Sequence, residues 1–134
     1  MNAADARIHI LVVDDEPMIR RFAAQVLEQE GYVVLEASDG AQALDLIRAA
    51  TVPLGVVVTD IVMPGLNGVE LLQVVATSHP DLPFILMTGY ATAQLTEMGI
   101  APPCATLAKP FPAERLLEEV RRCIKGENPI AAPH

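Results

Sequence analysis

The most constraining feature of this sequence is an apolar run that ends in a carboxylate. Residues 56–65 read VVVTDIVMPG. A continuous run of β-branched residues is typical of a strand that is buried on both faces, and the Pro-Gly pair then turns the chain away. Ligands of open parallel sheets bind at the carboxyl ends of the strands. Asp60, which stands at such an end, is therefore the first candidate for a reactive group.

Other short apolar segments are also expected to be strands, and the segments between them have the apolar spacing of helices. Strands are expected at residues 8–13, 32–37, 56–59, 84–87 and 106–108. Helices with apolar positions three or four residues apart are expected to begin near Pro17, Asp39, Asn67 and Pro112. Segment 91–103 is rich in poor helix formers, so only a short helix near 93–98, followed by a loop, is predicted there.

Strands that alternate with helices predict a parallel sheet with helices on both faces. Because crossover connections are right-handed, the expected architecture is an α/β, flavodoxin-like (βα)5 three-layer sandwich with strand order 2-1-3-4-5. One domain is expected over residues 1–134, with its core at about 8–125 and flexible tails at 1–6 and 127–134.

The composition excludes several functional classes. Hydrophobic residues make up 51% of the chain and charged residues 19%, as is typical of globular proteins. The net charge of −8 argues against nucleic acid or an anionic membrane as a direct partner. No apolar run approaches the roughly 20 residues of a membrane span, and the N-terminus lacks the pattern of a signal peptide. A cytoplasmic location is therefore expected, without membrane insertion.

The two cysteines, Cys104 and Cys123, are too few for a secreted disulfide scaffold and are expected to be reduced. The three histidines are scattered, and none is expected to be a metal ligand or a phosphohistidine. Tyr90 is expected to be a lid or a partner-facing side chain.

The residues that end the predicted strands form a chemically coherent set. Asp14 and Asp15 follow the first strand, Asp60 ends the third, Thr88 the fourth and Lys109 the fifth. The carboxyl ends of parallel strands share one edge, and the first and third strands are expected to be neighbours, so three carboxylates should meet. Three anions in a small pocket repel one another, which a divalent cation would relieve. Oxygen-only ligands favour a hard ion, Mg²⁺ (or Mn²⁺).

This set is what phosphoryl transfer to a carboxylate requires: a nucleophile, a cation and a lysine around the transferred group. The predicted roles are nucleophile and metal ligand for Asp60, direct metal ligand for Asp15, ligand through water for Asp14, backbone carbonyl ligand for Val62, and phosphoryl-oxygen binding for Lys109 and Thr88.

Four motifs in this order resemble the receiver domain of two-component response regulators. They read LVVDDEP at 11–17, TDIVMPGLNG at 59–68, MTGY at 87–90 and AKPF at 108–111. Each motif alone is weak, but four in the right order, each at a strand end, are specific. The resemblance covers roughly Ile8 to Lys125.

The resemblance implies phosphotransfer to Asp60 from the phosphohistidine of a histidine kinase or histidine phosphotransfer protein. It also implies slow self-catalysed hydrolysis and a cis Lys109–Pro110 peptide bond. Such a module is not an enzyme with a separate substrate; it changes protein contacts, here with an effector. Whether it stands alone or belongs to a larger protein is left open.

The chain departs from the family pattern at Thr106, where receivers usually carry Tyr or Phe three residues before the lysine. Thr88 and Thr106 are therefore the candidate switch residues. In place of a rotating ring, the expected switch is an ordering or shift of residues 89–105.

Other interpretations stay open at this point. A phosphatase of the haloacid dehalogenase type also forms an aspartyl phosphate, but it would want an Asp two residues after the nucleophile, where Val62 stands. A degenerate receiver that acts as an unphosphorylated binding module is the alternative that Thr106 supports. Flavin binding, which this fold permits, is disfavoured because the chain is acidic after the first strand.

Overall fold

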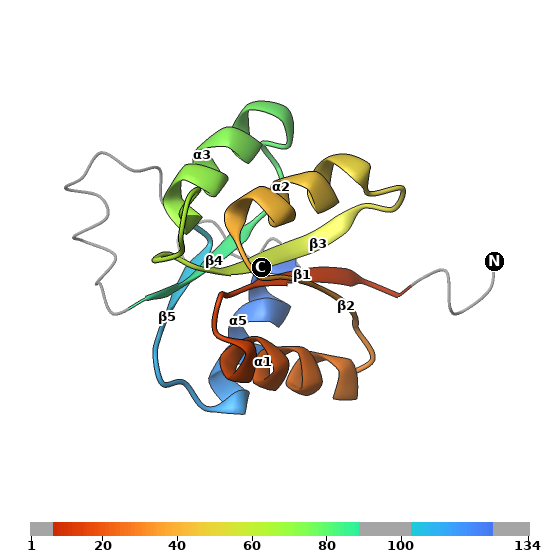
Figure 1. The fold of residues 1–134 in the computed structure, drawn as a ribbon. Helices are drawn as coiled ribbons and strands as arrows, with labels where there is room; N and C mark the ends of the chain where they lie inside the picture. Colours follow the sequence, from red (N-terminus) through yellow and green to blue (C-terminus); the bar gives the residue numbers. More distant parts are fainter. Residues whose placement is uncertain (1–6, 89–102, 125–134) are drawn as a thin grey trace.

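A computed structural model describes residues 7–88 and 103–124, in which one parallel five-stranded sheet lies between two layers of helices (Figure 1). The strands are β1 (His9–Val13), β2 (Val33–Ala37), β3 (Leu54–Asp60), β4 (Phe84–Thr88) and β5 (Ala105–Ala108). The helices are α1 (Pro17–Gln29), α2 (Gly40–Ala49), α3 (Gly68–Ser78) and α5 (Ala113–Ile124). The strand order β2-β1-β3-β4-β5 confirms the predicted flavodoxin-like topology.

The alternation of side chains along β1 explains why the central strands are apolar throughout. Leu11 and Val13 pack against α2 and α3, whereas Ile10 and Val12 pack against α1 and α5. Figure 1 shows α2 and α3 on one face of the sheet and α1 and α5 on the other. A strand covered on both faces buries every side chain, so its sequence carries no polar alternation.

Local sequence signals set where the helices begin. Pro17 occupies the first turn of α1, where its missing N–H is not needed. The Asp39 side chain accepts from the N–H of Gln42 and caps α2. Asn67 and Glu70 form a reciprocal capping box at the start of α3. These local signals fix where α1, α2 and α3 begin.

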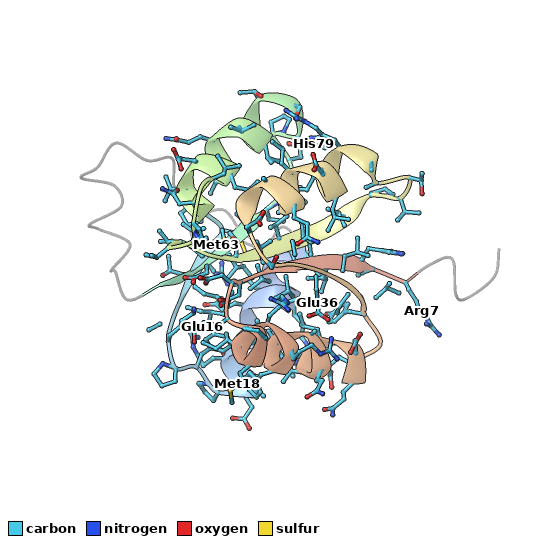
Figure 2. All side chains as sticks on the ribbon, viewed as in Figure 1. Arg7, Glu16, Met18, Glu36, Met63 and His79 are labelled. Atoms are coloured by element: carbon cyan, nitrogen blue, oxygen red, sulfur yellow. A yellow bond between two sulfur atoms is a disulfide. The ribbon has the colours of Figure 1, made fainter. Side chains whose placement is uncertain are left out.

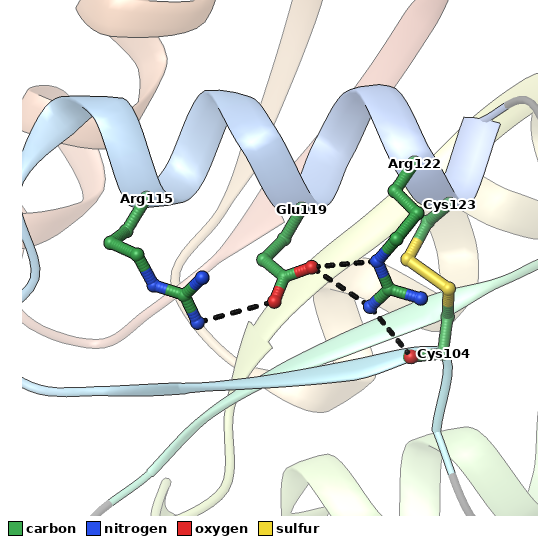
Figure 3. The surroundings of a disulfide bond; sticks show 5 residues. All are labelled: Cys104, Arg115, Glu119, Arg122 and Cys123. Atoms are coloured by element: carbon green, nitrogen blue, oxygen red, sulfur yellow. Dashed lines mark hydrogen bonds and ion pairs between the residues drawn. A yellow bond between two sulfur atoms is a disulfide. The ribbon is translucent and has the colours of Figure 1, made fainter. Parts of the chain in front are cut away.

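The two cysteines contradict the prediction that they are reduced. Cys104, just before β5, and Cys123, in the last turn of α5, form a disulfide with a Cα–Cα distance of 6.0 Å. Figure 3 shows the bond beside the ion pairs of Arg115, Glu119 and Arg122 on α5. The small number of cysteines says nothing about their distance in the fold. Although 19 residues separate the two, α5 folds back over the sheet and brings its last turn to the start of β5.

Some predictions lie outside the described residues: the short helix near 93–98, Tyr90, and the tails at 1–6 and 127–134. Within the two described ranges, none of the helices has the length and apolar character needed to cross a membrane.

Candidate functional site

The carboxyl ends of three strands bring the predicted site residues together. In the sheet register, Val13 of β1 lies beside Thr59 of β3. Asp14 and Asp60 each follow one residue of this pair. Lys109 follows β5 directly, at the same edge of the sheet. The Lys109–Pro110 peptide bond is cis, as the resemblance implied.

Three carboxylates meet at this edge. One oxygen from each of Asp14, Asp15 and Asp60 lies within 4.8 Å of the other two. Asp14 is fully buried and Asp60 is 8% exposed, whereas Asp15 is open to solvent. This acidic cup, as we call these three residues, offers oxygen ligands alone, at spacings that one cation can bridge. The donor set fits a hard divalent ion such as Mg²⁺.

Lys109 spans the buried part of the acidic cup. Its Nζ lies 2.9 Å from Oδ2 of Asp14 and 3.2 Å from Oδ2 of Asp60. The same Nζ therefore partly compensates two buried carboxylates. Three carboxylates against one ammonium leave two negative charges in the set, which is the charge that a divalent cation would neutralise.

The electrostatics of Asp60 reflect this imbalance. Burial raises the pKa of Asp60 above the ordinary value of 3.8, the charge of Asp14 raises it further, and Lys109 opposes both. Burial alone would lower the pKa of Lys109, but its hydrogen bond and charge interactions with Asp14 and Asp60 raise it above 10.5. The lysine thus stays protonated, while the carboxylate of Asp60 is held in an environment that favours a second cation.

Asp14 and Asp15 are presented differently. Oδ1 of Asp14 accepts from the N–H of Glu16 at 2.9 Å, and Oδ2 accepts from Lys109. Both oxygens of Asp14 are thus already engaged, whereas the exposed Asp15 faces solvent. This difference is consistent with a direct ligand role for Asp15 and a more indirect role for Asp14.

Gly68 packs the start of α3 against the backbone of Asp60. A Cβ at Gly68 would stand 2.2 Å from the carbonyl oxygen of Asp60, and the N–H of Gly68 donates to the carbonyl of Ile61 at 2.9 Å. Only glycine permits this approach, and it folds the loop after β3 back over the strand end. The close packing therefore explains why the last residue of the motif TDIVMPGLNG, Gly68, is a glycine.

The other predicted site residues are Val62, Thr88 and Thr106, and the structure gives their positions in the fold. Val62 follows the end of β3 and is 69% exposed. Thr88 is the last residue of β4, but its side chain is outside the described part of the structure. Thr106 is half-buried in β5 beside Leu86 of β4.

Phe22 of α1 lies outside the buried core. The residue is 42% exposed, and the centroid of its ring lies 6.2 Å from that of Phe111. With Met18, which is 85% exposed, these rings border a hollow of about 590 Å³ that reaches Lys109. Figure 2 shows Met18 on the outer side of α1. Helical spacing cannot distinguish an apolar side chain that packs inward from one at the edge of a helix face.

Arg20 contacts the acidic cup from behind, and Glu36 contacts Arg20. Arg20 of α1 donates to the backbone carbonyl of Asp14 and to Glu36 of β2. Sequence reasoning missed both residues. Nothing in the local pattern sets this arginine apart from its neighbour Arg21, and its carboxylate partner lies 16 residues away.

Comparison with known proteins agrees with this geometry. Residues 10–121 match the model of the response regulator receiver domain family. The response regulator receiver protein CpdR of Brucella abortus is 35% identical over 116 residues, covering 86% of this chain and 95% of that protein. The C4-dicarboxylate transport transcriptional regulatory protein DctD of Pseudomonas aeruginosa is 38% identical over 122 residues, which cover 90% of this chain but 26% of that protein.

Solved structures show the same fold. A CheY-like response regulator receiver domain protein of Methanospirillum hungatei superimposes with a TM-score of 0.81 at 29% identity, covering 90% of this chain and 96% of that one. The receiver domain of the hybrid histidine kinase CckA has a TM-score of 0.72 at 31% identity, covering 87% and 98%. The chain spans only 13% of the sensor kinase CckA of Brucella abortus, so similarity there concerns one part of a longer protein.

Proposed function

Because this chain belongs to the response regulator receiver domain family, we propose that it is a phosphoacceptor module in which Asp60 takes a phosphoryl group. The observation that carries the proposal is the double contact of Lys109 Nζ, 2.9 Å from Asp14 and 3.2 Å from Asp60. It leaves a cationic group beside the carboxylate that would be phosphorylated, at a strand end where ligands of this fold bind.

In this proposal, an oxygen of Asp60 attacks phosphorus in line with the phosphorus–nitrogen bond of a phosphohistidine. As the new P–O bond forms, the P–N bond breaks and its electron pair returns to the imidazole nitrogen of the donor. Lys109 and Thr88 bind equatorial oxygens of the transferred group, where negative charge is spread. The same residues, with a water molecule, would support the slow hydrolysis of the aspartyl phosphate.

Mg²⁺ or Mn²⁺ is the cofactor that the acidic cup would hold. Asp15 and Asp60 would bind it directly, Asp14 through water, and the backbone carbonyl of Val62 would complete the protein ligands. The bound cation supplies positive charge that offsets repulsion between Asp60 and the incoming phosphoryl group.

The partners that follow are a histidine kinase or histidine phosphotransfer protein as donor and an effector protein as target. An exposed apolar hollow beside Lys109, bordered by Met18, Phe22 and Phe111, supports a protein partner at the same edge of the sheet. The net charge of −8 disfavours direct contact with nucleic acid. A cytoplasmic location belongs to the proposal, as does self-catalysed transfer without a separate substrate.

The switch is proposed to involve Thr88 and Thr106. A threonine at 106 has no ring to swing inward, so the proposal places the change in residues 89–105, by ordering or displacement. Amide hydrogen exchange with and without beryllofluoride, a phosphoryl mimic, tests this idea. Unchanged protection across 89–105 would rule it out.

Incubation with acetyl phosphate and Mg²⁺ tests the phosphoacceptor role. The protein should gain the mass of one phosphoryl group, and the gain should disappear in Asp60→Asn and in the presence of a chelator. Steady turnover of small phosphate esters would favour a phosphatase instead. No gain from acetyl phosphate or from a phosphohistidine donor would favour a degenerate receiver that only binds.

A further inference from the structure

The turn from β1 into α1 is held by hydrogen bonds on three successive peptide groups. The N–H of Asp14 donates to the carbonyl of Ala37 at 3.1 Å, and the N–H of Glu16 donates to Oδ1 of Asp14 at 2.9 Å. Between them, the Asp14 carbonyl accepts from Nη1 of Arg20 at 2.9 Å. That middle peptide group joins Asp14 to Asp15, so its orientation sets where both carboxylates begin.

Arg20 is itself held in place. Its Nε donates to Oε1 of Glu36 at 3.1 Å, and the two side chains are only 19% and 25% exposed. The planar fork of a guanidinium can bind the carbonyl and the carboxylate at once, which an ammonium cannot do in the same geometry. Figure 2 shows Glu36 on the α1 side of the sheet. The end of β2 therefore holds the turn at two points. The Ala37 carbonyl binds it directly, and Glu36 binds it through Arg20.

Arg21 offers a natural comparison. It also pairs with Glu36, and its second ion-pair partner is Glu28 at 3.9 Å. Its side chain is 47% exposed, and among the described residues it makes no hydrogen bond to the turn at 14–16. The two arginines thus share a carboxylate and a helix, and differ in contact with the acidic cup.

We propose that Arg20, held by Glu36, is a positioning residue for the cation site. It fixes the peptide group between Asp14 and Asp15, so that their carboxylates meet Mg²⁺ with little rearrangement. This inference rests on the proposed function, because it assumes that the acidic cup binds the cation. Contacts that orient ligands from behind typically account for a 10- to 100-fold difference in metal affinity.

Titration with Mg²⁺ alone, followed by amide NMR signals of the β1–α1 turn, tests the proposal without any phosphodonor. Arg20→Ala should weaken Mg²⁺ binding by about tenfold, whereas the matched control Arg21→Ala should stay within about twofold of wild type. Arg20→Lys should recover part of the loss, because one ammonium can still reach the carbonyl of Asp14. The Mg²⁺ affinity of Glu36→Gln should lie between the affinities of the two alanine variants.

The rate of phosphorylation by acetyl phosphate provides a second measurement. In Arg20→Ala, the Mg²⁺ concentration that gives half the maximal rate should rise about tenfold, while the maximal rate stays close to that of wild type. A generally damaged fold would lower the maximal rate instead. Both measurements are made well below the melting temperature of each variant.

Equal Mg²⁺ affinity in Arg20→Ala and Arg21→Ala would overturn the proposal. A loss of Mg²⁺ affinity that parallels the loss of thermal stability in both variants would also overturn it. A wild-type protein that binds no Mg²⁺ would overturn it together with the proposed function. If wild type binds Mg²⁺ but takes no phosphoryl group, the proposed function fails alone, and the titration still decides whether Arg20 positions the acidic cup.

Discussion

At the scale of single residues, the balance between Lys109 and its carboxylates decides what the strand-end site can do. Asp14 is fully buried and is compensated by Lys109, whose own side chain is 21% exposed. Removing one partner of a buried ion pair leaves the other charge uncompensated. The resulting loss in the free energy of unfolding is larger than the net stabilisation that the pair itself provides. Lys109 is thus expected to matter for folding as well as for binding of a phosphoryl oxygen.

Lys109→Ala should lower the free energy of unfolding by about 3 kcal/mol when no Mg²⁺ is present. Saturating Mg²⁺ should recover part of this loss, because it restores positive charge near Asp14 and Asp60. Urea unfolding with and without Mg²⁺ measures both effects. The control is Arg115→Ala, which breaks exposed pairs with Glu118 and Glu119 and should change stability by less than about 1 kcal/mol. Equal effects of the two substitutions would contradict the role given to Lys109.

The raised pKa of Asp60 predicts a pH dependence with a definite sign. The folded protein holds the Asp60 proton more tightly than the unfolded chain, so ionisation of Asp60 opposes folding above the ordinary pKa of 3.8. Without metal, Asp60→Asn should therefore be more stable than wild type at neutral pH. The difference should close as the pH falls through the raised pKa of Asp60 toward 3.8.

Denaturant unfolding of both proteins over this pH range, with chelator present, checks the prediction. Mg²⁺ at neutral pH should reverse the order, because it binds the wild-type carboxylate. A variant that is less stable than wild type at every pH would show that the ion pair with Lys109 outweighs burial.

At the scale of elements, close approaches connect the site to the helices. The start of α3 rests on the backbone of Asp60 through Gly68, and α5 is joined to the start of β5 by Cys104 and Cys123. The disulfide encloses the segment that carries Lys109. The placement of Asp60 and of Lys109 thus depends on contacts made by the elements on either side.

Gly68→Ala should lower the free energy of unfolding by about 2 kcal/mol, because the added carbon meets backbone that cannot move aside easily. It should also weaken Mg²⁺ binding by displacing Asp60. Gly55→Ala is the matched control, since its added carbon meets the side chain of Ile8 at the opposite end of β3. If Gly68→Ala loses stability but keeps wild-type Mg²⁺ affinity, the α3 contact does not position Asp60.

Closure of the segment between Cys104 and Cys123 should stabilise the oxidised protein by about 3 kcal/mol, mainly by restricting the unfolded chain. Urea unfolding with and without reductant measures the difference, and Cys104→Ala with Cys123→Ala should make stability insensitive to reductant. Thiol titration of the protein purified without reductant should find no free thiol. Two free thiols in that preparation would contradict the bond.

At the scale of the whole molecule, the sequence determines the layers and the strand order because both depend on periodicity and chain direction. Buried strands such as β1 and β3 are apolar throughout, and parallel strand ends must share an edge. The acidic cup and Lys109 were predictable for that reason. The disulfide, the exposed position of Phe22 and the contact of Arg20 with Glu36 were not, because each depends on how distant elements pack and carries no local signal.

The central claim is that Asp14, Asp15, Asp60 and Lys109 converge on one cation and one phosphoryl group. A crystal structure of the protein with Mg²⁺ and beryllofluoride tests it most directly. We expect beryllium bonded to an oxygen of Asp60, Lys109 against a fluorine, and Mg²⁺ held by Asp15, Asp60 and the carbonyl of Val62. A cation bound away from the acidic cup, or an unmodified Asp60 with Lys109 turned into solvent, would contradict the account.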